Sequence, residues 1–312
     1  MEIDQVEAFV AIVRGRGVTR AAAALHLSQP AVSRRLDLLE RELGAPLFER
    51  IRSGVILTEA GRAFLPHAEA MLASMRDGAE AVRALEGPDR GAITVALVGT
   101  LASTALTAAL RAFRERYPGV ALRLRTALSR EVSALVRRGD AVLGLRYGTD
   151  SDPDLVSRVV HDEPRVVVCS PHHRLARSRR VDPGALQGEA WIGFPPRPDE
   201  PEEPYAISLR QSLAACGLGA AEVIPIDSLT AQKRMVEAGF GLAQLPASSV
   251  DEELRAGSLV VLSVPAMQTT IPVVLIQRRR GYLSGAARGL LRVLTDWPRA
   301  DRAAPGRRSR RR

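Results

Sequence analysis

The stretch TRAAAALHLSQPAVSRRLDLLERELGAPLFER, residues 19–50, decides the fold of the N-terminal part of this chain. It predicts two helices joined by a tight turn at His26-Leu27. Thr19 is expected to cap the first helix, and Ser28 can cap the second through its hydroxyl. Pro30 falls in the first turn of the second helix, where its missing N–H costs nothing. The pattern is that of a helix-turn-helix.

The second of these helices has two chemically different faces. Its apolar residues recur at helical spacing and are Val32, Leu36, Leu39 and Leu43. Its opposite side carries Gln29, Ser33, Arg34 and Asp37. Arg34 suits a bidentate contact to guanine, and Gln29 suits adenine or a phosphate. A solvated face of an ordinary three-helix module is the alternative, but the Ser-Gln-Pro start favours a DNA-reading helix.

The flanking segments complete a winged module. Residues 1–18 place apolar side chains at helical spacing and predict a helix that packs behind the helix-turn-helix. The segment APLFERIRSGVILTEAG predicts a β-hairpin wing anchored by Leu47 and Phe48, with its turn at Ser53-Gly54. Thr58 then begins a long helix that is expected to run to about Glu86.

That long helix carries one apolar seam, which consists of Phe64, Met71, Met75, Val82 and Leu85. A helix with such a seam and no local partner usually packs against a second subunit. The pattern therefore favours a dimer. Packing against the chain's own C-terminal domain is the alternative.

Composition limits the possible classes of protein. At 312 residues and 46% apolar, the chain can bury more than one core. It has no run of membrane-spanning length and no basic, apolar leader, so a soluble, cytoplasmic protein is expected. The net charge is +9, but residues 1–62 hold nine arginines against eight acidic residues, and residues 299–312 hold seven arginines and one aspartate. The prediction of DNA binding therefore depends on the motif, and the basic tail is expected to be disordered.

From Ala92 onward, strands alternate with helices, which predicts βαβ units and a mostly parallel sheet. A second such set begins near Glu163, and IPVVLIQRR (271–279) indicates a strand that returns to the first set. The chain then crosses twice between two α/β lobes. Such a hinged cleft is a common place for a small ligand.

Candidate ligand-binding residues lie at strand-to-helix turns. Thr100 and Ser103 occupy one turn, where hydroxyls and free N–H groups could seat a carboxylate, and Ser129 lies on the next such turn. Each could equally be a simple helix N-cap. On the second lobe, Phe194 and the segment Ser228 to Thr230 are expected to face the same cleft.

Other chemistry is disfavoured. Cys169 lies in an apolar strand beside His172 and His173, and neither a metal nor a cofactor is expected. A redox pair of Cys169 with Cys216 would require proximity that the sequence does not show. An enzyme with an appended DNA-binding module lacks a recognisable catalytic constellation. A sensor without DNA function conflicts with the intact recognition helix.

The chain resembles the LysR-type transcriptional regulators. The motifs are FVAIVRGRGVTRAAAALHLSQPAVSRRLDLLERELGAPLFER and LTEAGRAFLPHA, followed more weakly by FRERYPGV, VVCSPHHRLA and VEAGFGLAQLP. The resemblance implies a winged helix-turn-helix, a dimerisation helix, and a two-lobed α/β effector domain like periplasmic binding proteins. It also implies promoter DNA, a small effector, further copies of the chain and RNA polymerase as partners.

The resemblance assigns roles and boundaries along this chain. It implies a DNA-binding domain at 1–58, a linker helix at 59–88, an effector domain at 89–298 and a tail at 299–312. Lobe I would comprise about 92–161 and 269–298, and lobe II about 162–268. Gln29, Pro30, Ser33 and Arg34 match recognition-helix positions. The remaining positions expected at DNA are Thr19, Ser28, Arg35, Arg50, Arg52 and Thr58. Arg35 and Val142 depart from the family pattern.

Overall fold

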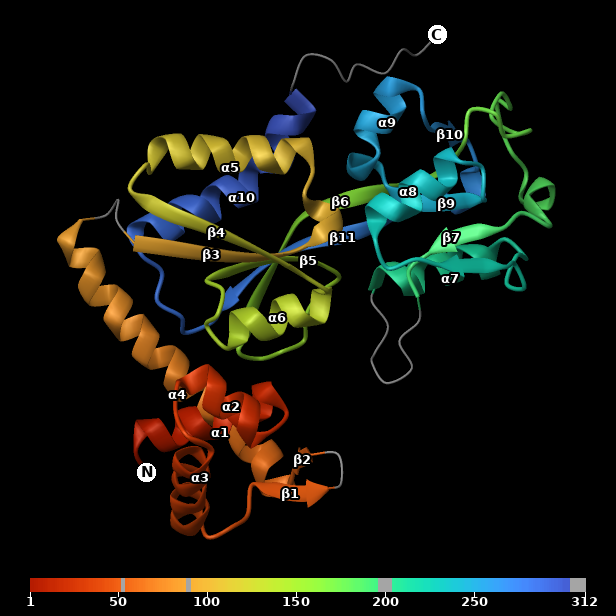
Figure 1. The fold of residues 1–312 in the computed structure, drawn as a ribbon. Helices are drawn as coiled ribbons and strands as arrows, with labels where there is room; N and C mark the ends of the chain where they lie inside the picture. The colour runs from red at the N-terminus through yellow and green to blue at the C-terminus, as the bar shows by residue number, and fades with distance from the viewer. Residues whose placement is uncertain (52–53, 88–90, 196–203, 304–312) are drawn as a thin grey trace. The chain divides into compact units, whose positions relative to one another are not determined.

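The computed structural model describes residues 1–51, 54–87, 91–195 and 204–303. The chain divides into two compact units, shown as a ribbon in Figure 1. Met1–Glu86 and Arg137–Asp140 form the first unit, and Gly87–Val136 and Ala141–Arg312 form the second. Within the described ranges, no helix is long and apolar enough to cross a membrane.

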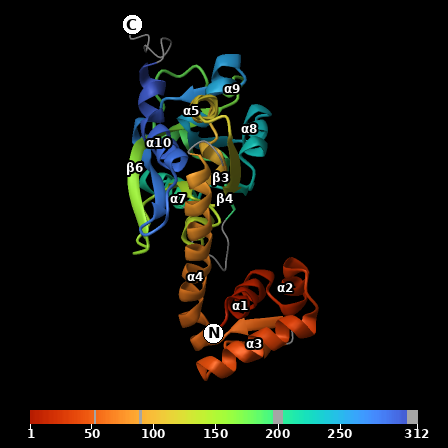
Figure 2. The same ribbon diagram turned by 90° about the vertical axis from the view of Figure 1, so that its left-hand side faces the viewer.

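The first unit contains three short helices, a hairpin and one long helix. In Figure 2, α1, α2 and α3 lie together at the start of α4. The β1–β2 hairpin is antiparallel, with Phe48 opposite Leu57. The elements are α1 (Ile3–Gly15), α2 (Val18–Leu25), α3 (Gln29–Leu43), β1 (Phe48–Ile51), β2 (Gly54–Leu57), α4 (Glu59–Arg83) and the 3-10 turn η1 (Ala84–Glu86).

Apolar burial holds these helices together. Phe9 and Ile12 of α1 are fully buried, and so are Val32 and Leu39 of α3. The alanine-rich α2 packs closely, because small side chains let backbones approach. The predicted apolar stripe of α3 is wrong at one position. Leu43 is 40% exposed, since it is the last residue of the helix and follows the buried positions.

The helix caps match the sequence expectation except at Thr19. Gly17 occupies the N-cap of α2, so Thr19 lies inside the first turn and is exposed. Ser28 caps α3 as predicted, with its Oγ accepting the Ala31 N–H at 3.3 Å. The turn before it places His26 in the left-handed region, at φ 55°. Thr58 caps α4 by accepting the Gly61 N–H at 2.9 Å.

The second unit is built on one sheet of nine strands in the described residues, ordered β4-β3-β5-β11-β6-β9-β7-β8 with β10 beside β6. Its first half is β3 (Gly91–Val98), η2 (Gly99–Leu101), α5 (Thr104–Arg116), β4 (Val120–Ala127), α6 (Ser129–Arg137), β5 (Leu143–Tyr147), β6 (Leu155–Cys169), η3 (Pro183–Leu186) and β7 (Trp191–Gly193). Its second half is α7 (Pro204–Ala215), β8 (Val223–Pro225), α8 (Leu229–Glu237), β9 (Leu242–Pro246), η4 (Ala247–Ser249), α9 (Asp251–Ala256), β10 (Val260–Leu262), η5 (Pro265–Met267), β11 (Thr269–Arg278) and α10 (Gly285–Ala303).

Two long strands, β6 and β11, join the two lobes of this unit. β6 pairs with β11 from Leu155 to Arg165 and then with β9 and β10. A bulge interrupts the ladder where Val273 faces His161 and Val274 faces Val159. The prediction from sequence, which began the second lobe near residue 163, missed that β6 starts at Leu155.

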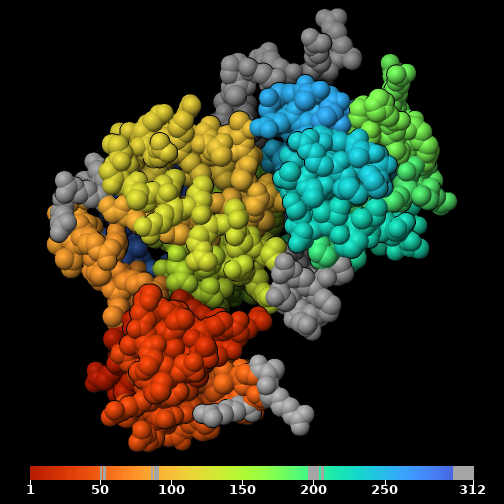
Figure 3. Space-filling model, in the orientation of Figure 1, coloured from red at the N-terminus to blue at the C-terminus, as the bar shows by residue number. Residues whose placement is uncertain are grey.

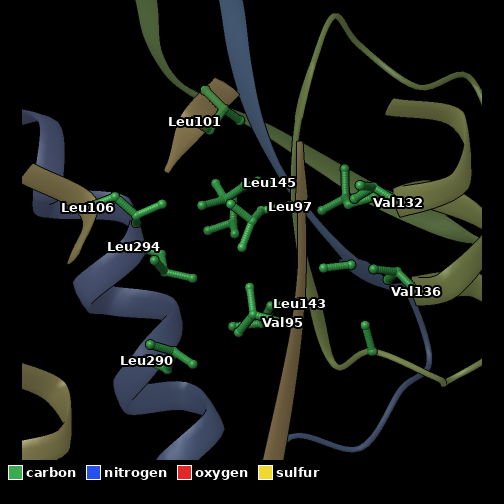
Figure 4. Close-up of a cluster of buried hydrophobic side chains, with 14 of the residues drawn as sticks. Val95, Leu97, Leu101, Leu106, Val132, Val136, Leu143, Leu145, Leu290 and Leu294 are labelled. Carbon is green, nitrogen blue, oxygen red and sulfur yellow. The ribbon is translucent and has the colours of Figure 1, made fainter. Parts of the chain in front are cut away.

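The first lobe has the predicted parallel βαβ core, with β3 parallel to both β4 and β5. The expectation of a mostly parallel sheet is wrong, because β11 and β6 run antiparallel to their neighbours and make the sheet mixed. Figure 4 shows Leu97 and Leu145 pointing toward Leu294 of α10, while Val132 of α6 covers the opposite face. Burial on both faces explains why β3 and β5 are almost continuously apolar. α10 continues to Ala303, so residues 299–303 of the expected disordered tail are helical. Residues 304–312 lie outside the described residues.

Candidate DNA-reading face and ligand-sensing loops

The polar side of α3 faces outward and is not used by internal packing. Gln29 and Arg34 are exposed, and Ser33 is half-buried. Within the described part of the chain, Arg34 forms neither an ion pair nor a side-chain hydrogen bond. Because Val32 and Leu39 are fully buried on the other side, the helix presents its polar groups on a fixed support.

Arg35 differs from its neighbour Arg34. Its Nε lies 3.2 Å from the Asp4 carboxylate, so α1 holds the guanidinium. The structure therefore brings Gln29, Ser33 and Arg34 together on one outward face and ties Arg35 to the module itself. Ser28 and Pro30, at the exposed start of α3, flank the same face.

The wing is fixed to α3 by a carboxylate that the prediction from sequence missed. Glu40 accepts the backbone N–H of Leu47 at 2.6 Å and that of Phe48 at 3.3 Å. The only signal in the sequence is an acidic residue in the last turn of the helix before the hairpin. Arg50 lies on β1, with a side chain that is not described, and Arg52 falls outside the described residues.

Thr58 has a structural role in the module. It is 9% exposed, and its hydroxyl both donates to the Pro46 carbonyl at 2.7 Å and accepts from Gly61. A hydroxyl has one proton to donate, and Pro46 receives it. The expected phosphate contact of Thr58 therefore has no donor available.

An apolar groove lies along α4 within the first unit. Its volume is about 840 Å³, and its lining residues are Met1, Ile3, Phe64, His67, Ala70, Met71, Ser74 and Met75. The predicted seam divides here. Phe64 and Met71 pack partly on the module, while Val82 is 65% and Leu85 86% exposed. Val82 and Leu85 are therefore apolar side chains that the described residues leave largely uncovered.

In the second unit, candidate sensing groups collect at the carboxyl ends of parallel strands. Thr100 follows β3, Ser129 follows β4, and Tyr147 ends β5. The Thr100 hydroxyl is buried and donates to Tyr147 Oη at 3.1 Å. The prediction from sequence missed Tyr147, whose only signal is its place at the end of an apolar strand. This edge is where ligands bind in α/β sheets.

The other residues predicted to bind the effector lie at helix starts or, for Phe194, against the core of the first lobe. Ser103 caps α5 by accepting the Leu106 N–H at 3.3 Å, and Ser228 caps α8 by accepting the Ala231 N–H at 3.4 Å. Thr230 is exposed in the first turn of α8. Phe194, by contrast, leaves the second lobe and packs against the core of the first. The two lobes also meet where Thr104 Oγ1 donates to Glu252 at 3.4 Å.

The cysteines are poorly suited to redox chemistry. Both are free, and Cys169 is fully buried. Burial, with a smaller effect from Glu189, raises the pKa of the Cys169 thiol to about 11, and burial also raises the pKa of Cys216. Because the thiolate is the reactive form, the raised pKa makes both thiols less reactive, and Cys169 behaves as a small apolar core group.

The geometry defines a winged helix-turn-helix protein joined to a two-lobed α/β ligand-binding unit. Residues 3–62 match the model of the bacterial regulatory helix-turn-helix proteins of the lysR family, and residues 86–299 match the LysR substrate binding domain. The chain therefore belongs to the LysR-type transcriptional regulators, which confirms the resemblance. It is a DNA-binding transcriptional regulator with an effector-binding domain.

Similar proteins support this assignment over nearly the whole length. The chain is 31% identical to the HTH-type transcriptional regulator TfdS of Cupriavidus pinatubonensis, covering 95% of this chain and 97% of the relative. It is 29% identical to the RuBisCO operon transcriptional regulator of Allochromatium vinosum, covering 92% and 93%. Among solved structures, full-length OxyR from Pseudomonas aeruginosa has the same fold, with a TM-score of 0.69 at 22% identity, over 96% of this chain and 95% of that chain. Full-length CbnR, solved with its target DNA, gives 0.61 at 23% identity over 96% and 99%.

Proposed function

We propose that α3 reads operator DNA in the major groove, under the control of a small carboxylate held between the two lobes. The observation that carries the DNA part is the outward polar face of α3, with Arg34 unpaired in the described residues. Arginine presents two parallel donors that match the O6 and N7 acceptors of guanine. The complex of the structurally similar CbnR with its target DNA supports this role.

The carboxylate part is supported by the loop after β3. The N–H groups of Thr104 and Ala105, at the start of α5, have no acceptor among the described residues. A helix N-terminus with free N–H groups favours a bound anion. The Thr100 and Tyr147 hydroxyls lie at the same edge of the sheet and can exchange their mutual hydrogen bond for one to a ligand.

Calorimetric titration of the full chain with small mono- and dicarboxylates tests this part. Thr100→Val should weaken binding of the carboxylate that binds wild type by about tenfold, as expected for one lost hydrogen bond to a charged group. Thr107→Val on the exposed side of α5 is the matched control and should bind as wild type does. If no carboxylate in the panel binds, the proposed ligand class is wrong.

The response is proposed to be a change in lobe orientation about β6 and β11, which alters how the modules meet the DNA and so how RNA polymerase is recruited. A ligand-dependent change in footprint length is expected. If ligand changes transcription while the footprint stays the same, this mechanism fails.

We also propose that a second copy of the chain covers the α4 groove and the exposed seam. Val82, near the end of α4, and Leu85, in η1, are the most exposed large apolar side chains of this segment, and a partner helix would bury them. Val82→Glu with Leu85→Glu should weaken the dimer at least ~100-fold in sedimentation experiments, since buried charges oppose association. The control, Glu80→Lys, changes a charge on the side of α4 opposite the seam. An unchanged dimer in the double variant would overturn the assignment of this interface.

A further inference from the structure

A cationic surface lies on the second lobe, in the segment between β6 and η3. This segment, residues 170–182, carries Arg174, Arg177, Arg179 and Arg180. Figure 3 shows this part of the chain, in green, at the right-hand edge of the second unit. We call Arg177, Arg179 and Arg180 the arginine triad.

A hydrogen-bonded network around the half-buried Glu189 builds the first half of the segment. Glu189 accepts hydrogen bonds from His173 Nε2 at 3.1 Å and from Arg174 Nη2 at 2.6 Å. Burial alone would raise the pKa of Glu189, but these two hydrogen bonds lower it below the ordinary glutamate value, so the carboxylate stays charged. His173 Nδ1 accepts the Leu175 N–H at 3.2 Å, which uses the second ring nitrogen as well.

Backbone contacts fix the second half. The Ala176 N–H donates to His173 O at 2.9 Å, and the Ser178 N–H donates to Leu175 O at 3.0 Å. The Val181 N–H is anchored to Ser263 O at 2.8 Å. Leu175 and Ala176 also pack against the core of the lobe. The loop is therefore a fixed platform, and binding to it costs little backbone entropy.

The arginine triad takes no part in the contacts that hold this segment. All three side chains are exposed, and none forms an ion pair or a side-chain hydrogen bond within the described residues. The nearby carboxylates already have structural roles, because Glu189 binds His173 and Arg174, and Asp182 accepts the Gly184 N–H at 3.0 Å. Arginine is the side chain best matched to phosphate oxygens.

We propose that the arginine triad binds the phosphate backbone of duplex DNA flanking the site that α3 reads. Residues 1–62 carry a net charge of only +1, so the long-range electrostatic attraction of this module to DNA is weak. A fixed cationic loop elsewhere in the same chain would add phosphate contacts, and each such contact releases counterions. In an oligomer, each copy adds one such loop.

The test compares full-length wild type with the triple variant Arg177→Gln, Arg179→Gln, Arg180→Gln. Fluorescence anisotropy is measured between about 0.05 and 0.3 M NaCl on two duplexes that share a selected binding site, one minimal and one with long flanks. On the long duplex, the slope of log K against log [salt] should become shallower by up to ~2.7 per bound copy, about 0.9 for each lost phosphate contact. The minimal duplex should bind both proteins equally.

A second triple variant controls for net charge. Arg114→Gln, Arg116→Gln, Arg123→Gln removes three exposed arginines from the first lobe and should keep the wild-type slope. Lysine at all three positions of the triad should restore the slope, because the charge is kept. An unchanged slope in the triad variant would overturn the proposal, and so would an equal loss in the control. Normal DNA binding with lost transcription would assign the triad to an acidic protein instead.

Discussion

The two units place their polar groups in opposite ways. On α3, Gln29 and Arg34 point outward and play no part in packing, while a separate apolar face holds the helix. At the sheet edge of the second unit, Thr100 and Tyr147 are buried and bonded to each other. A reader of DNA must present donors to a partner that stays outside. A sensor can keep its groups paired until a small ligand enters and replaces the internal partner.

The largest loss of stability is expected at Gly61, where the backbone of α4 lies very close to the backbone of another segment of the first unit. A Cβ at Gly61 would lie 2.1 Å from Leu47 O, which is backbone and cannot move aside cheaply. Gly61→Ala should therefore destabilise the module by roughly 3 kcal/mol or more and abolish DNA binding, while the thermal transition of the second unit stays in place.

Gly78 provides the matched control, because it lies on the same helix and a Cβ added there would meet nothing within 4 Å. Gly78→Ala should raise stability by about 0.5–1 kcal/mol, since alanine is the better helix former. Calorimetry that found equal effects at the two glycines would contradict the close approach at Gly61.

In the second unit, removing the buried Thr100 hydroxyl should lower the stability of the fold as well as weaken ligand binding. Thr100→Val deletes the donor to Tyr147 in a buried site and should lower the free energy of unfolding by about 1–2 kcal/mol. Thr107→Val, on an exposed face, should stay within about 0.5 kcal/mol of wild type. If Thr100→Val and wild type gave equal unfolding curves, the polar groups of the second unit would not support the fold, and the two units would not differ in this respect.

Much of the fold and of the outward face of α3 could be predicted from the sequence, and the features that could not be predicted have physical causes. The caps Ser28 and Thr58 and the apolar strands were predictable because their signals are local. The length of β6, the small elements α9 and β10, and the role of Tyr147 depend on pairing with distant segments. Thr58 was expected at DNA, but its hydroxyl is consumed by Pro46 and Gly61. Spacing identifies a hydroxyl and does not show which neighbour occupies it.

The smallest loss of stability is expected at Ser28. This residue is exposed at the start of α3, but its hydroxyl caps the helix and so supports the fold. Ser28→Ala removes the acceptor of the Ala31 N–H and should cost about 1 kcal/mol. Urea unfolding followed by circular dichroism measures this loss. If Ser28→Gly costs as much as Ser28→Ala, the side-chain cap is not the cause, because glycine is itself tolerated at this position.

We propose that the outward face of α3 specifies the DNA sequence without supporting the fold, and Arg34→Ala tests this most directly. A motif is first selected from a random duplex library with wild type, and Arg41→Ala, in the last turn of α3, serves as the control. Affinity of Arg34→Ala for the selected motif should fall by ~1–3 kcal/mol, while binding to unrelated duplex and the unfolding temperature stay near wild type. An equal loss on both duplexes, or no loss on either, would contradict the account.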